Sequence, residues 1–131
     1  MIDIENDVID AVYPFLSGLV PNGGLVSEYV HKPAFLPHVY LSEIDNTPDG
    51  HTLESGEREW SSIVTYEAQV YGRSKPECRS IQAALDEAMV RTLGFRKLQA
   101  QFIPNMEDAA VYRIVARYTA GVTRTGDLYK P

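Results

Sequence analysis

Metal binding is the first chemistry that the residues of this 131-residue chain could support. Its histidines are His31, His38 and His51. A zinc site would need His31 and His38 to meet across the proline-containing connection between them, with Glu28 or Glu43 as a third ligand. Isolated histidines at strand ends are more often ordinary polar positions, so we expect no metal site.

Nucleophilic catalysis would depend on Cys78, the single cysteine. It lies in the first turn of an expected helix over 75–93, where the helix dipole could lower the pKa of the thiol. One cysteine cannot form an internal disulfide and leaves no thiolate cluster for zinc. We interpret Cys78 as a small, half-buried thiol near Arg79.

The other patterns that accompany catalysis or ligand binding are incomplete. Asp86-Glu87 are neighbours on a helix and so do not face each other, which predicts a solvated helix face. Glu107-Asp108 fall in a turn, and Asn22-Gly23-Gly24 lacks the lysine and the strand-to-helix context of a phosphate loop. Trp60 and the eight tyrosines are not interleaved with basic residues. We therefore expect neither enzymatic activity nor a cofactor.

The net charge of −6 argues against strong nucleic-acid binding, which depends on Lys and Arg neutralising phosphates. No apolar run has the roughly 20 residues that a membrane span needs, and the acidic start differs from a signal peptide, so we expect synthesis in the cytoplasm. One segment holds most of the charge, with six acids against Arg58 for a net of −5: Glu43, Asp45, Asp49, Glu54, Glu57 and Glu59.

Two helices are expected to position these groups. Apolar residues at three- and four-residue spacing predict one helix over 3–16, with Pro14 kinking or ending it. The second spans 75–93, beginning at the capping-box pattern of Ser74 and Glu77 and ending at Gly94.

Strands are expected over 25–31, 37–44, 60–71, 95–103 and 109–122, from their β-forming residues and alternating pattern. A long polar loop occupies about 46–58, and a turn occupies 104–108. This order predicts one α+β domain over 1–131, a mostly antiparallel sheet with both helices packed on one face.

Several segments together resemble the small tail-completion proteins of long-tailed phages that infect Gram-positive bacteria, also called minor capsid or head–tail connector proteins. The resemblance covers nearly the whole chain in order and is weakest over 47–58. It rests on Ile2-Asp3-Ile4-Glu5-Asn6, Lys32-Pro33-Ala34-Phe35-Leu36-Pro37, Tyr66-Glu67-Ala68-Gln69-Val70-Tyr71, Leu93-Gly94-Phe95, the run from Pro104 to Arg113, Arg117-Tyr118-Thr119-Ala120 and Leu128-Tyr129-Lys130.

The resemblance implies a tail-terminator fold and a ring, commonly of six copies, at the head-proximal end of the tail. Such a ring would cover the growing face of the tail tube and join it to the connector or stopper protein of the neck. Genomic DNA would pass through the bore without specific binding. The chain would assemble in the host cytoplasm and remain in the virion, with no cofactor and no catalysis.

Charge suggests how such a ring could be built, because a head-to-tail ring joins two different surfaces of each subunit. The acidic residues of 43–59 could dock on the neighbour's basic C-terminal strand, where the candidates are Arg113, Arg117, Arg124 and Lys130. Alternatively they could line the bore and repel DNA, or form a solvated hairpin.

Two other function classes remain open at this point. One is a small α+β ligand- or protein-binding module of a host-type protein. The other is a small enzyme built around Cys78 or the histidines. A fold resemblance alone excludes neither of these two classes.

Overall fold

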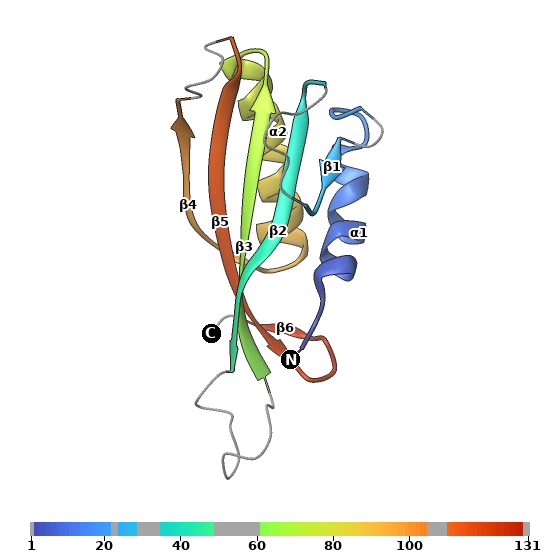
Figure 1. Cartoon of the computed structure of the whole chain (residues 1–131). Helices are drawn as coiled ribbons and strands as arrows, with labels where there is room; N and C mark the ends of the chain where they lie inside the picture. Colours follow the sequence, from blue (N-terminus) through green and yellow to red (C-terminus); the bar gives the residue numbers. More distant parts are fainter. Residues whose placement is uncertain (1, 22–23, 29–34, 49–60, 105–109, 130–131) are drawn as a thin grey trace.

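The computed structural model describes residues 2–21, 24–28, 35–48, 61–104 and 110–129, and it confirms an α+β fold. These residues form two helices and a mostly antiparallel sheet (Figure 1). Along the sequence the elements are α1 (Glu5–Leu16), β1 (Leu25–Val26), β2 (His38–Pro48), β3 (Ser61–Gly72), α2 (Lys75–Asp86), the π-helical segment η1 (Glu87–Thr92), β4 (Arg96–Ile103), β5 (Tyr112–Thr123) and β6 (Leu128–Tyr129).

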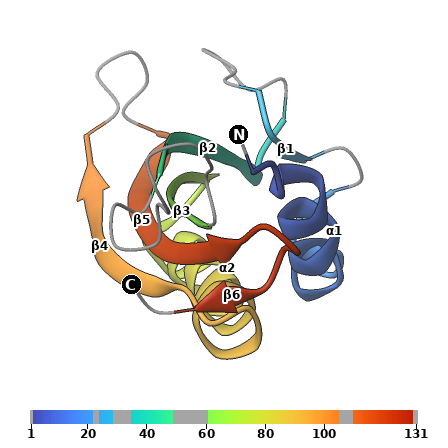
Figure 2. The ribbon, with the colours of Figure 1, turned by 90° about the horizontal axis from the view of Figure 1, so that it is seen from below.

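The sheet has the strand order β1-β2-β3-β5-β4, and β6 pairs with the C-terminal end of β5. Strand β1 runs parallel to β2, and every other pairing is antiparallel. The longest pairing joins β3 to β5, from Ser61 opposite Thr123 to Gly72 opposite Tyr112. Viewed along the strands, the sheet curls so that its concave side faces the helices (Figure 2).

Alternation along the two central strands builds the core. Inner-face residues of β3 and β5 are buried, while the residues between them form a largely polar outer face. Both helices pack on this inner face, as predicted. No helix in the described part of the chain is long and apolar enough to cross a membrane. The buried residues include Val8, Val12, Leu16, Val64, Tyr66, Ala68, Val70, Ile81, Leu85, Met89, Phe95, Ile114, Ala116, Tyr118, Ala120 and Val122.

The second helix begins and ends close to where its sequence predicted. The Ser74 hydroxyl accepts from the Glu77 amide at 3.2 Å, while the Glu77 carboxylate accepts from Arg73 N–H at 2.8 Å, one residue before the cap. From Glu87 onward the helix widens into η1, where Leu93 N–H donates to Ala88 C=O. Gly94 follows with a φ of 86°, which glycine adopts at little cost.

The strand boundaries of the first half differ from the predicted ones. Strand β2 continues to Pro48, four residues beyond the predicted end at Ile44, because β3 pairs with it there across a bulge between Glu43 and Asp45. Tertiary pairing thus gives extended structure to the polar start of the predicted 46–58 loop. The first predicted strand, 25–31, is described only to residue 28, and its strand consists of Leu25 and Val26.

A substitution at Leu85 tests the packing of the core, because this side chain of α2 is fully buried. We expect Leu85→Ala to lower the free energy of unfolding by about 2–5 kcal/mol, measured by urea denaturation. Leu98→Ala is the matched control, since Leu98 is 48% exposed on β4. Equal effects of the two substitutions would contradict this packing.

Candidate functional site

The histidine that the structure describes is a packing residue. His38 is 5% exposed, and its ring lies 6.3 Å from that of Phe35 and 6.2 Å from that of Tyr71. Burial lowers its pKa, which favours the neutral ring. His31 and His51 lie outside the described residues, and within those residues no three His, Cys, Asp or Glu side chains are grouped to hold a metal ion.

Cys78 is fully buried, rather than half-buried as its sequence position suggested. Burial, and then the nearby Glu77 carboxylate, raise the pKa of the thiol to about 11. These effects outweigh the helix dipole, which acts in the opposite direction. At neutral pH the sulfur is therefore a protonated thiol that packs in the core, where it lies 3.5 Å from Tyr112 C=O.

Asp86 is not the solvated residue that the Asp86-Glu87 pair predicted. Its carboxylate accepts from the Tyr118 hydroxyl at 2.6 Å and from Gln82 Nε2 at 3.0 Å, and it pairs with Lys97 Nζ at 2.8 Å. Glu87 does face solvent, with a side chain 54% exposed. Asp86 ties α2 to both β4 and β5, and burial followed by this carboxylate raises the pKa of Tyr118.

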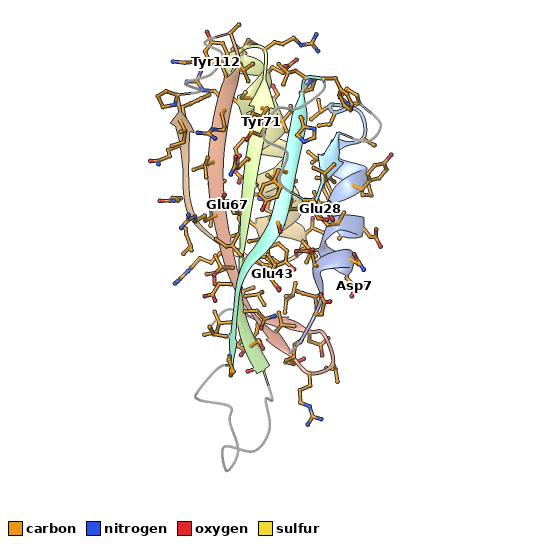
Figure 3. The ribbon with its side chains drawn as sticks, viewed as in Figure 1. Asp7, Glu28, Glu43, Glu67, Tyr71 and Tyr112 are labelled. Atoms are coloured by element: carbon orange, nitrogen blue, oxygen red, sulfur yellow. The ribbon has the colours of Figure 1, made fainter. Side chains whose placement is uncertain are left out.

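The charged candidates for an assembly surface that the structure describes do not lie together. Glu43 is on the inner face opposite Tyr66, and its backbone N–H donates to the Glu5 carboxylate at 2.9 Å (Figure 3). Asp45 is exposed on the other side of the bulge. The remaining four acids, Asp49, Glu54, Glu57 and Glu59, lie outside the described residues.

The three arginines occupy three separate places. Arg117 already has a partner on its own chain, since its guanidinium lies 3.1 Å from Glu67 on the outer face. Arg124 lies in the turn after β5, beside a hollow that Asp3 and Asp7 also line. Arg113 lies at the other end of β5. The sequence therefore grouped residues that the fold separates.

Arg113 lines a hollow of about 310 Å³ at the junction of β4, β5 and the start of α2, which we call the basic hollow. Aromatic and aliphatic side chains form its walls, and cations surround them. Lys75 Nζ lies 5.6 Å and Arg79 Cζ 5.3 Å from the centre of the Phe102 ring. The lining residues are Lys75, Phe102, Ile103, Pro104, Val111, Tyr112 and Arg113.

The cations of the basic hollow have no acidic partner among the residues that the structure describes. None of the ion pairs of the described residues involves Lys75, Arg79 or Arg113. The Nε atom of Arg113 is buried without a hydrogen-bond acceptor. Sequence reasoning found Arg113 but missed Lys75 and Arg79, although their four-residue spacing places both on one helix face.

Removing the Asp86 carboxylate should destabilise the fold. Asp86→Ala leaves the Tyr118 hydroxyl without its acceptor and removes one of the two acceptors of Gln82 Nε2, so we expect the free energy of unfolding to fall by about 1–3 kcal/mol. The control Glu87→Ala removes a neighbouring exposed carboxylate and should change it by less than about 0.5 kcal/mol. Chemical denaturation measures the free energy of unfolding of both variants. Similar decreases for Asp86→Ala and Glu87→Ala would contradict the stabilising role of the Asp86 hydrogen bonds.

Glu43 makes stability depend on pH. Burial, only partly offset by the Asn46 hydrogen bond, raises its pKa above the ordinary 4.5. The folded state therefore binds this proton more tightly, and the benefit is lost as pH rises through the folded-state pKa. Glu43→Gln should raise the free energy of unfolding at neutral pH, with the gain shrinking on acidification toward 4.5. Asp45→Asn, which removes an exposed carboxylate of the same strand, is the matched control, and equal effects of the two variants would contradict this assignment.

No protein-family model matches this chain, and the curated proteins gave no significant match. Among solved structures, the chain is similar to one in the virion of native gene transfer agent (GTA) particle. The match has a TM-score of 0.61 and 18% sequence identity, and it covers 85% of this chain and 90% of that chain. At this identity the likeness shows a shared fold over nearly the whole length of both chains.

Proposed function

We propose that this chain is a structural assembly protein of a phage-like virion, acting as a ring subunit at the head-proximal end of the tail. The observation that carries the proposal is the fold shared with a chain of the gene transfer agent virion, over 85% of this chain and 90% of that one. The motif resemblance to tail-completion proteins points to the same class of particle.

The sheet edge supports an assembly role. Strand β4 is an edge strand of eight residues, and its first six side chains, Arg96 to Gln101, are exposed. Within the described residues its backbone pairs on one side only, with β5. Such an edge attracts another chain unless it is covered or guarded by charge, and a neighbouring subunit would cover it.

The proposed mechanism is geometric and involves no catalysis. A closed ring, which we take to have six copies, stops polymerisation of the tail tube by covering its growing face. It presents a new face to the connector or stopper protein and keeps a bore open for DNA. The net charge of −6 suits passage of DNA without specific binding. The protonated Cys78 thiol and buried His38 support a non-enzymatic role.

Mass measurement in solution tests the ring. We expect the purified full chain to form particles of about six times its 14.7 kDa mass, seen as closed rings by negative-stain electron microscopy. Antibody labelling should place it at the head-proximal end of the tail. Removing its gene should give tails of irregular length that fail to join heads.

The result that would overturn this proposal is a chain that stays monomeric and is missing from purified virions. Monomers with a bound small molecule would instead favour the host-type binding module. Antibody labelling on the connector side would keep the virion role and move the ring one position toward the head.

A further inference from the structure

We propose that the basic hollow binds the acidic segment 49–60 of a neighbouring copy, so that the ring is joined by one hollow-to-segment contact per subunit. This inference rests on the proposed function, because it names the two surfaces that would join the ring.

The basic hollow lies at one end of the sheet, and β2 and β3, the strands on either side of segment 49–60, meet at the other end. Arg113 is opposite Tyr71 near the end of β3, whereas Pro48 and Ser62 are paired at the other end. Tyr112 marks the upper end in Figure 3, and β2 ends and β3 begins at the lower end in Figure 1. Ten residues of β3 separate Ser61 from Tyr71, which corresponds to roughly 34 Å at about 3.4 Å per residue.

The segment is too short to reach the hollow of its own chain. Its 12 residues must leave Pro48 and return to Ser61, on paired strands. Each arm can therefore use only about half of them, and even fully extended it spans roughly 20 Å. A contact between segment and hollow must then join two copies. Because it uses different surfaces on each copy, it is a head-to-tail contact of the type that closes rings.

The two parts are complementary in charge. The segment has Asp49, Glu54, Glu57 and Glu59 against one arginine, Arg58. The hollow is surrounded by Lys75, Arg79 and Arg113, which make no ion pair with any described residue of their own chain. A guanidinium binds a carboxylate through two parallel hydrogen bonds. A glutamate of the neighbour would thus supply the acceptor that buried Arg113 Nε lacks.

The apolar walls add a second match. Phe102, Ile103 and Tyr112 line the hollow, and the segment includes Leu53 and Trp60 among its charged residues. A buried aromatic anchor such as a tryptophan, surrounded by a polar rim, is typical of specific protein contacts. Free acidic side chains alone would bind such a hollow with less geometric preference.

The other two arginine positions fit the segment less well. Arg117 already binds Glu67 at 3.1 Å. The hollow beside Arg124 is also lined by Asp3 and Asp7, whose negative charge would repel an acidic segment. Of the three places where the fold puts an arginine of the candidate set, the basic hollow is therefore the best acceptor.

Charge reversal in the hollow tests the contact. The double variant Lys75→Glu/Arg79→Glu changes exposed residues near the start of α2, where acidic side chains suit the helix dipole, so its fold should be retained. We expect the apparent mass of this variant, measured by light scattering, to fall from that of the ring to that of a monomer. The matched control Arg91→Glu, which reverses a side chain 78% exposed in η1, should still form rings.

Rescue identifies the segment as the occupant. Adding Glu54→Lys, Glu57→Lys and Glu59→Lys to the Lys75→Glu/Arg79→Glu variant should restore rings, because each reversed hollow then meets a reversed segment. The segment triple variant alone should be monomeric. Raising the ionic strength should dissociate wild-type rings, since the proposed contact includes exposed charges.

Each other outcome separates this inference from the proposed function. Rings of Lys75→Glu/Arg79→Glu that match the wild type would overturn the docking and leave the ring function standing. Normal rings from the segment triple variant would show that a different partner occupies the hollow. A wild-type chain that is monomeric but labelled at the tail end would contradict the docking and keep the virion role. A chain missing from virions would contradict the proposed function itself.

Discussion

The antiparallel pairing of β3 with β5 is the constraint on which the rest of the structure depends. It matches twelve residues of each strand in one uninterrupted register, from Ser61 opposite Thr123 to Gly72 opposite Tyr112. Because side chains alternate between faces, this register aligns two buried stripes on the inner face, and both helices pack on them. A shift of one residue would place those stripes on the outer face and leave the helices without a core.

Polar contacts connect the periphery to this centre. Asp86 joins the end of α2 to Tyr118 in β5 and to Lys97 in β4. The ion pair with Lys97 therefore fixes the edge strand β4 to α2, in addition to the backbone pairing of β4 with β5. At the other side of the sheet, the Glu5 carboxylate accepts from the backbone N–H of Glu43 in β2. A side chain of α1 thereby covers part of the edge of β2, while no described strand pairs with the outer edge of β4.

The long strands also explain why the molecule has two chemically different ends. The lower end includes Asp3, Asp7 and Asp45 among its described residues, against Arg124, and the strands on either side of segment 49–60 meet there. At the upper end, Lys75, Arg79 and Arg113 gather around Phe102. A subunit with opposite charge at two ends of a rigid sheet is suited to head-to-tail association, which is what a ring requires.

Local sequence determined the elements of this fold. Alternation along 60–71 and 109–122 predicted β3, β5 and their buried faces, and the Ser74 cap with Gly94 predicted the extent of the second helix, because these signals act over a few neighbouring residues. Tertiary structure decided where those elements meet. Pairing with β3 extended β2 past Ile44. A hydrogen bond from the Tyr118 hydroxyl made Asp86 a structural residue of the fold and not a solvated one. The extended conformation of β5 separated Arg113, Arg117 and Arg124, and the packing of α2 placed Lys75 beside Arg113. Residues distant in sequence become neighbours only when strand register and helix packing are set.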